Sequence, residues 1–258
     1  MNFKKMHGLG NDFVIFDARS ENIFLTPEDM ALVADRRWGV GCDLIAVLEE
    51  SDKADIRVYF FNADGSESGA CGNASRCIAD ILINESKKET CTIEVNDGIL
   101  NCRKKDDLFI EVDMGVPKDI RDLDLKRGEV SNPVALDMGN PHCIFFVDDL
   151  EDIPVDELGA YFEVHKEFPE KANVGFAQVQ DKGHIRLRTW ERGVGLTEAC
   201  GTNACATVVS AVRRDLTDRK VEIEVDGGAL TLEWREEDHH VLMTGPVAYV
   251  FDGALNTV

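Results

Sequence analysis

The second half of this 258-residue chain repeats the first at a shift of about 129 residues, which restricts the possible folds more than any other feature. The match is clearest around two cysteines, where Ala70–Ala74 reads Ala-Cys-Gly-Asn-Ala and Ala199–Asn203 reads Ala-Cys-Gly-Thr-Asn. Further upstream, Gly10-Asn11 in the first half corresponds to Gly139-Asn140 in the second. One repeat of this length predicts two homologous domains rather than a solenoid of many short units.

Both halves contain many short strand-like segments and about two helices each. Apolar and polar residues alternate along His184–Trp190, as expected of a half-buried strand. Helix starts are predicted at Thr26–Asp29, from a capping threonine followed by proline and acids, and at Ile153–Glu157. The more strongly apolar helix of each half follows the aligned cysteine, Cys71 or Cys200.

These two helices have broad apolar faces with the 3.6-residue period. The faces consist of Ala74, Cys77, Ile78, Ile81 and Leu82 in the first half, and of Ala204, Cys205, Val208, Val209 and Val212 in the second. A mostly apolar helix among many strands indicates a curved sheet wrapped around it. The sequence therefore predicts an α+β protein of two lobes related by a pseudo-two-fold axis, each a mostly antiparallel sheet around a central helix.

The boundary between the halves is predicted near Pro117, where proline and several charged residues interrupt the strand pattern. Residues 1–116 then form a first lobe with Cys71, and residues 117–249 form a second lobe with Cys200. The active site is expected in a cleft between them.

Charge and hydropathy exclude some classes of partner. The formal net charge is −21, and so acidic a surface repels phosphate backbones and anionic lipids. The chain begins without the apolar segment of a signal peptide, and its apolar runs are too short to span a bilayer. A cytoplasmic protein is expected, bound neither to nucleic acid nor to membrane. Its eight cysteines are then expected to be thiols.

The positions of Cys71 and Cys200 suit proton transfer. Free N–H groups and the dipole at a helix start favour a thiolate and can also bind a carboxylate. The glycines that follow, Gly72 and Gly201, permit close approach of the backbone. Two such helix starts, facing each other, would hold one carboxylate and place a sulfur on each face of the adjacent carbon. One thiolate would remove the α-proton, and the opposite thiol would deliver another, which inverts the configuration.

Structural uses of cysteine are the alternative. Cys42, Cys91, Cys102 and Cys143 are expected to be small buried side chains, as are Cys77 and Cys205 on the helix faces. Four thiolates from Cys71, Cys77, Cys200 and Cys205 would make a zinc site, but their spacings are wider than the usual zinc knuckle. No metal and no cofactor are predicted.

Several segments resemble the signature of the diaminopimelate epimerase family over nearly the whole chain. They are Met6–Phe13, Phe61–Glu67, Cys71–Asn73 with Arg76-Cys77, Gly139–His142, Ala172–Phe176, Glu191–Gly193 and Ala199–Thr202. The resemblance implies interconversion of LL- and meso-2,6-diaminopimelate without pyridoxal phosphate or metal, a step in lysine and peptidoglycan precursor synthesis. It also implies two barrel-like lobes, a homodimer, and a C-terminal segment, about residues 250–258, that returns to the first lobe.

The resemblance also assigns roles to individual residues. Cys71 and Cys200 would be the proton-transfer pair, and His142 and Glu191 would tune their pKa values. The carboxylate clamp would be Gly72, Asn73, Gly201 and Thr202, and the other substrate contacts would be Asn11, Asn62, Asn140, Asn173, Glu191 and Arg192. Arginine suits a bidentate grip on the far carboxylate, and amides suit a substrate with ammonium and carboxylate groups at both ends.

Two positions depart from the family pattern. Leu44 stands where some members have a glutamine that could contact substrate, and Phe251 stands where a tyrosine is linked to dimer contacts. Related racemases or epimerases of proline, hydroxyproline or histidine are an alternative with the same mechanism. They are expected to lack the full distal set of Asn62, Asn173 and Arg192. A zinc-binding structural protein is the alternative from another class.

Overall fold

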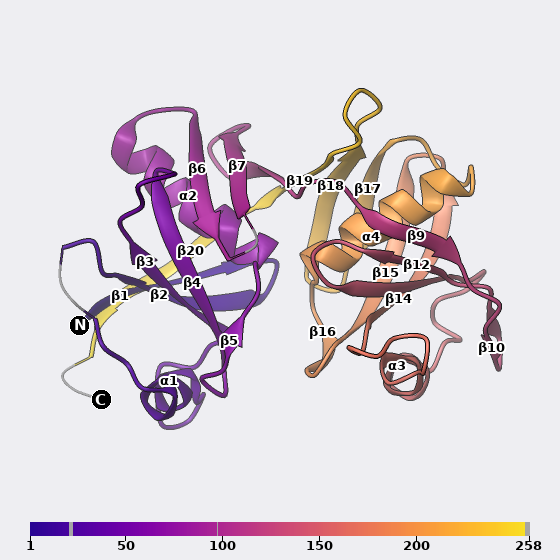
Figure 1. The fold of residues 1–258 in the computed structure, drawn as a ribbon, viewed down its shortest axis with the longest axis horizontal. Coiled ribbons are helices and arrows are strands. Elements are labelled where there is room, and N and C mark those ends of the chain that lie inside the picture. Colours follow the sequence, from indigo (N-terminus) through magenta and orange to yellow (C-terminus); the bar gives the residue numbers. More distant parts are fainter. Residues whose placement is uncertain (21–22, 97, 256–258) are drawn as a thin grey trace. The chain divides into compact units, whose positions relative to one another are not determined.

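The computed structural model describes residues 1–20, 23–96 and 98–255, and divides the chain into two compact units. Unit 1 contains residues 1–112 and the C-terminal segment from Gly245, and unit 2 contains Asp113–Thr244. The division thus falls after Val112, where the sequence predicted a boundary after residue 116. Figure 1 shows both units as strands around a helix, in agreement with the predicted α+β class.

The strands and helices of unit 1 follow in a regular order. They are β1 (Asn2–Gly8), β2 (Asn11–Asp17), α1 (Pro27–Ala34), β3 (Leu44–Glu49), β4 (Ile56–Asn62), β5 (Glu67–Ser68), α2 (Gly72–Ser86), β6 (Thr90–Val95), β7 (Gly98–Lys104), β8 (Phe109–Asp113) and, from the C-terminus, β20 (Ala248–Ala254). Leu9 and Gly10 turn the chain between β1 and β2 with φ values of 58° and 83°, as a type I′ hairpin requires.

Unit 2 repeats this order. Its elements are β9 (Lys118–Asp122), β10 (Lys126–Arg127), β11 (Val130–Ser131), β12 (Val134–Asp137), β13 (Pro141–Phe146), α3 (Val155–Glu163), β14 (Asn173–Asp181), β15 (His184–Glu191), β16 (Gly195–Thr197), α4 (Gly201–Arg213), β17 (Lys220–Val225), β18 (Gly228–Trp234) and β19 (Val241–Pro246).

Strand pairing confirms the repeat that the sequence predicted. In unit 1 β1 and β2 are antiparallel, β2 and β3 parallel, β3 and β4 antiparallel, and β4 and β6 parallel. In unit 2 the same relations join β12 with β13, β13 with β14, β14 with β15, and β15 with β17. Even the register matches, since Phe13 pairs with Leu44 and the corresponding His142 pairs with Asn173.

The last strand of each repeat belongs to the unit that contains the rest of the other repeat, and it pairs inside that unit. After the first repeat, β9 pairs with β12 of unit 2, and after the second repeat β20 pairs with β1 of unit 1. Lys5 faces Phe251 across the β1–β20 pair, which has a register shift after Lys5. The C-terminal segment as far as Leu255 therefore lies in unit 1, a return that only the family resemblance had implied, and residues 256–258 of that expectation lie outside the described residues.

The two central helices are surrounded by sheet. Helix α2 contacts β1, β2, β6 and β7, and α4 contacts β12, β13, β14, β17 and β18 (Figure 1). All residues from Gly72 to Ile83 and from Gly201 to Ala211 are buried, so both helices are enclosed on every side over those stretches. The polar residues within these stretches are held in the protein interior.

Helices α1 and α3 begin where the sequence predicted. Thr26 caps α1 in a capping box, since its hydroxyl accepts from the Asp29 N–H and the Asp29 carboxylate accepts from the Thr26 N–H. Helix α3 starts after Pro154 and packs on β14, β15 and β16. Its contact strands lead to the turn at Glu191 and Arg192, so α3 supports that turn.

The structural cysteines are buried as expected. Cys42, Cys77, Cys91, Cys102, Cys143 and Cys205 are all buried, and no disulfide joins any of the eight cysteines within the described residues. Burial raises the pKa of Cys42 to about 11 and that of Cys77 to about 12. These two thiols stay protonated near neutral pH, as expected of cysteines that only fill the core.

Candidate active site

Cys71 and Cys200 are the N-cap residues of α2 and α4, in nearly the same backbone conformation. Their φ and ψ angles are −115° and 109° at Cys71 and −117° and 110° at Cys200. The backbone carbonyl of each cysteine accepts the first hydrogen bond of its helix, from Ser75 N to Cys71 O at 2.8 Å and from Ala204 N to Cys200 O at 3.0 Å. Neither side chain makes a capping hydrogen bond.

The first turns of both helices suit an anion. Helix geometry leaves the N–H groups of a first turn without acceptors inside the helix. Neither first turn contains an acidic side chain. A carboxylate beside each cysteine would therefore meet N–H donors and the positive end of a helix dipole.

In unit 1 the amide of Asn11 lies beside Cys71. Its oxygen is 3.8 Å from Cys71 Sγ and accepts from the Asn73 amide nitrogen at 3.2 Å. Its nitrogen donates to Asp43 Oδ2 at 2.9 Å. Because a carboxylate only accepts, Asp43 fixes the orientation of the Asn11 amide, with the oxygen toward the thiol.

Asp43 is held by an ionic network. Arg36 binds both Asp43 and Asp12, and Lys5, with a nearly buried side chain, binds Asp12 at 2.5 Å. Although burial opposes ionisation of Asp12, hydrogen bonds from Arg36 and Lys5 hold its pKa at about 2. Asp12 is therefore ionised at ordinary pH. Asp43 was not predicted from the sequence, and its counterpart in the repeat, Ala172, is small and apolar.

In unit 2 the amide of Asn140 contacts a histidine. His142 is fully buried, and its Nε2 lies 2.7 Å from Asn140 Oδ1. Burial, helped by the positive charge of Arg192, lowers the pKa of His142 to about 3. The ring is thus neutral at ordinary pH, and Nε2 donates to the amide oxygen. Cys200 Sγ lies 3.5 Å from the Thr202 hydroxyl, which can donate to a thiolate.

The buried His142 makes stability depend on pH. Its pKa lies below the ordinary 6.5 of an unfolded chain, so the unfolded state binds more protons between those values. Stability should therefore fall as the pH is lowered from 6.5 towards 3, by at most about 1.4 kcal/mol per pH unit for one proton. Urea unfolding of the wild type and His142→Gln at pH 7.5, 5.5 and 4.5 measures this. We expect the free energy of unfolding to depend less on pH in the variant. An equal dependence would contradict the lowered pKa of His142.

The two charged residues predicted to contact substrate lie where β15 ends, with Glu191 as its last residue and Arg192 in the turn that follows. The Arg192 N–H donates to Asn173 Oδ1 at 2.9 Å, and its guanidinium donates to the Glu170 carbonyl at 3.1 Å. Asn173 also donates to the carbonyl of Pro141. Glu191 Oε2 accepts from the Thr197 hydroxyl at 3.2 Å. The structure thus brings Glu191 and Arg192, at the end of β15, together with Asn173, at the start of β14.

The corresponding turn of unit 1 contains Asn62. Its side chain donates to the Ser66 hydroxyl at 3.0 Å, and its N–H donates to the Ser66 carbonyl at 2.8 Å. Leu44 pairs with Asn62 across β3 and β4, at the position that Asn173 occupies in the second repeat. Unit 1 therefore has an apolar side chain where unit 2 has an amide.

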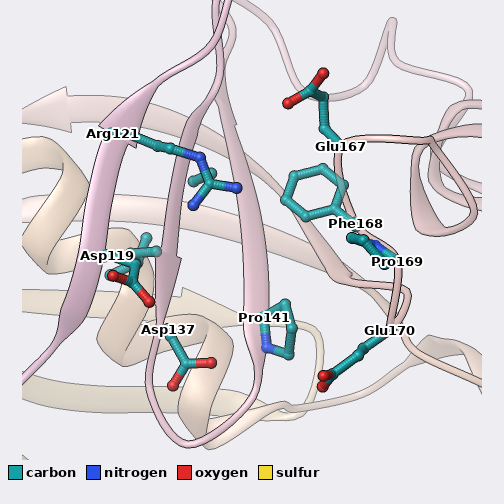
Figure 2. A pocket seen from close by; sticks show the side chains of 10 residues that line it. Asp119, Arg121, Asp137, Pro141, Glu167, Phe168, Pro169 and Glu170 are labelled. Atoms are coloured by element: carbon teal, nitrogen blue, oxygen red, sulfur yellow. The ribbon is translucent and has the colours of Figure 1, made fainter.

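A pocket of about 220 Å³ lies in unit 2, on the backbone that supports this turn. Figure 2 shows Asp119, Arg121 and Asp137 on one side of it and residues 167–170 on the other. Among the described residues, the predicted site side chains lie outside its lining, but two lining residues, Pro141 and Glu170, accept from Asn173 and Arg192 through their carbonyls. The pocket therefore adjoins the carbonyls that hold Asn173 and Arg192, and neither cysteine lines it.

The described part of the chain contains neither a cluster of metal ligands nor a membrane-spanning helix. There, no group of three or more His, Cys, Asp or Glu side chains is arranged to hold a metal ion. None of the helices described is both long and apolar enough to cross a bilayer.

Comparison with known proteins agrees with this arrangement. The family model described as diaminopimelate epimerase matches residues 3–120 and 134–250. The chain is 51% identical to a diaminopimelate epimerase of Acidiphilium cryptum over 98% of this chain and 96% of that protein. It is 46% identical to one of Rhodospirillum centenum, over 98% and 92% of the two chains.

Solved structures share the fold at lower identity. A phenazine biosynthesis protein of the PhzF family from Bacillus anthracis has a TM-score of 0.73 at 22% identity, covering 98% of both chains. A hydroxyproline epimerase from Agrobacterium vitis, with bound trans-4-hydroxy-L-proline, has a TM-score of 0.73 at 14% identity, covering 98% of this chain and 91% of that one. On its sequence match over nearly its full length, the chain belongs to the diaminopimelate epimerase family.

Proposed function

We propose that this protein interconverts LL- and meso-2,6-diaminopimelate with Cys71 and Cys200 as its two bases. One cysteine, as the thiolate, takes the α-proton and becomes a thiol. The electron pair of the broken C–H bond stays on the α-carbon and its carboxylate. The opposite cysteine, as the thiol, gives its proton to the other face and becomes the thiolate. The reverse reaction exchanges these roles, so no external acid, base or oxidant is consumed.

The observation that supports this most strongly is the matched placement of the two cysteines. Each caps a buried helix at the same point of the repeat, with φ and ψ values that differ by only a few degrees. A thiol used only for packing has no need of a first turn with available N–H donors. Other cysteines of the chain, such as Cys77 and Cys143, are buried deep enough that their pKa values rise.

The remaining site residues follow as parts of the same proposal. The first turns, with Gly72, Asn73, Gly201 and Thr202, bind the reacting carboxylate and stabilise the charge that develops on it. Asn11, Asn62, Asn140, Asn173, Glu191 and Arg192 bind the rest of the substrate, with Arg192 on the distal carboxylate. Glu191 and the neutral His142 tune the protonation of the thiols. A neutral imidazole does this as a hydrogen-bonding dipole rather than as a cation.

Incubation with LL-diaminopimelate in D2O tests the reaction. We expect one solvent deuteron at the inverted α-carbon of each product molecule, because a thiol that exchanges with solvent delivers the new proton. NMR of the α-position, together with chiral chromatography, follows the exchange and the inversion. Absence of both with each diaminopimelate isomer would reject the proposed function.

The same assay separates the rival activities. Proline, trans-4-hydroxy-L-proline and histidine should show no α-deuterium, since they lack the distal groups that Arg192 and its neighbours would bind. Activity should survive EDTA and should need no added pyridoxal phosphate. Incorporation of deuterium into proline and not into diaminopimelate would show that the protein is a proline racemase instead.

Assembly as a homodimer in the cytoplasm completes the proposal. Tyr249, Val250 and Phe251 of β20 are each about half exposed, and such apolar side chains suit burial against a second copy. The Phe251 ring is in edge contact with Phe3, which fixes its position in unit 1. Light scattering after gel filtration should give twice the chain mass of 28.7 kDa.

A further inference from the structure

A buried carboxylate fastens the turn that contains Glu191 and Arg192. Glu163, the last residue of α3, is only 7% exposed. Its Oε2 accepts from the indole N–H of Trp190 at 2.7 Å, and its Oε1 accepts from the N–H of Gly193 at 3.1 Å. The two donors stand immediately before and after the pair Glu191-Arg192. Both ends of this short segment are therefore tied to one side chain.

The helix that presents this carboxylate is itself fixed. Gly159 of α3 packs so closely on Trp190 that a Cβ there would lie 2.4 Å from Trp190 Cβ. One turn later, the carbonyl of Glu163 accepts from Ala172 N at 3.0 Å, just before Asn173. Glu163 thus joins α3, the start of β14 and the turn after β15, and these are the elements that position Asn173 and Arg192.

Among its described residues, the first repeat has no buried carboxylate at the corresponding position. Ala34 and Phe61 stand at the positions that correspond to Glu163 and Trp190. There the turn is held by the Asn62–Ser66 hydrogen bonds and by Gly65, which packs on the backbone of Pro27. The carboxylate occurs only in the unit whose turn has the charged pair, which points to a role in placing that pair.

The charge state of Glu163 fits this role. Burial alone would raise its pKa, but hydrogen bonds from Trp190 and Gly193, with the charge of Lys171, lower it. Lys171 Nζ lies 3.4 Å from Oε1 and its side chain is half exposed. The group is therefore an ionised acceptor with two N–H donors in fixed directions, and an amide could not accept from both.

We propose that Glu163 is a positioning residue that holds the Glu191-Arg192 turn in the orientation needed to bind the distal end of the substrate. This inference rests on the proposed function for the identity of the substrate. Glu163 then affects binding of the distal groups of the substrate and not proton transfer, because α2 and α4 position the two cysteines.

Glu163→Gln tests it. The amide is of equal size, but its oxygen can accept from only one of Trp190 and Gly193, and its NH2 group then faces the other donor. We expect KM for diaminopimelate to rise about tenfold or more, with kcat at saturation within about threefold of the wild type. Hydrogen exchange of the peptide covering residues 190–195, followed by mass spectrometry, should accelerate in the absence of substrate.

Three further variants sharpen the result. Glu163→Asp keeps the charge but shortens the reach, so it should resemble Glu163→Gln. Lys171→Met removes the ionic partner alone and should leave both KM and the exchange rate of residues 190–195 unchanged. Glu167→Gln, an exposed glutamate on the neighbouring segment, is the matched control for the substitution itself.

The outcomes separate this inference from the proposed function. If the wild type epimerises diaminopimelate and Glu163→Gln has an unchanged KM, or a fall in kcat alone, the positioning role is wrong and the function stands. If the wild type is inactive toward both isomers, the function is wrong, and hydrogen exchange alone decides the role of Glu163. Unchanged exchange in Glu163→Gln would then overturn it, and faster exchange would support it.

Discussion

Replacing either Cys71 or Cys200 by alanine should lower the rate of inversion by about a thousandfold or more, the upper range for loss of a general acid or base. The fold should persist, because each cysteine begins its helix through its backbone carbonyl and makes no side-chain cap. Chiral chromatography of the two diaminopimelate isomers measures inversion, and circular dichroism checks the fold.

Deuterium exchange distinguishes the two bases in these variants. With one thiol removed, the remaining thiolate can take the α-proton from the isomer it faces and return a deuteron to the same face. Each single variant should therefore exchange the α-proton of one isomer without inversion, and the two variants should prefer opposite isomers. The double variant should exchange neither. Normal turnover by either single variant would exclude a two-base mechanism.

Two buried cysteines serve as matched controls. Cys91→Ala in β6 and Cys205→Ala in α4 remove the same sulfur atom from buried positions of the two units. Both should lower stability, since truncation of a buried side chain leaves a small cavity, while they leave inversion nearly unchanged. A comparable loss of activity in these controls would show that packing, and not proton transfer, explains the effect at Cys71 and Cys200.

Gly65→Ala should destabilise the protein by about 3 kcal/mol, from two additive causes. Its φ of +81° lies in the left-handed region, and a Cβ would lie 2.1 Å from the carbonyl oxygen of Pro27. That oxygen belongs to the backbone of α1 and cannot move aside like a side chain. Because Gly65 closes the turn beside Asn62, the KM for diaminopimelate should rise as well.

Gly115→Ala isolates the conformational part of this effect. Its φ is +79°, almost the same, but a Cβ there meets nothing within 4 Å. We expect a loss of about 1 kcal/mol, which is the cost of the left-handed conformation alone. Urea unfolding midpoints of the two variants give the comparison. Equal destabilisation would mean that the contact with Pro27 contributes nothing.

Much of the fold could be predicted from the repeat because aligned residues occupy the same position in a helix or strand of both halves. Cys71 and Cys200 cap corresponding helices, and Phe13 and His142 occupy the same register although their side chains differ. The helix at Thr26–Asp29 was predicted from its capping chemistry, which depends on neighbours in sequence. Local signals of this kind need no knowledge of the tertiary fold.

Interactions between distant segments were harder to predict. Asp43 orients Asn11 through a hydrogen bond between residues far apart in the chain, and nothing in the local pattern around either one indicates it. Glu163 gave a weak signal, as an acid one turn after Gly159 in a helix with an apolar face, and such a residue is buried only if it finds partners. Those partners, Trp190 and Gly193, follow from strand pairing that the sequence does not reveal.

The exchanged strands β9 and β20 bear on how such a chain could have arisen. Each repeat finishes its own sheet with a strand borrowed from the end of the other repeat. A single-repeat ancestor, half the present length, would have had to donate its last strand to a second copy and accept one in return. Fusion of two gene copies would turn this exchange of strands between two molecules into strand pairing within one polypeptide. Cys71, with the Asn11 amide beside it, and Cys200, with the Thr202 hydroxyl beside it, then belong to one molecule.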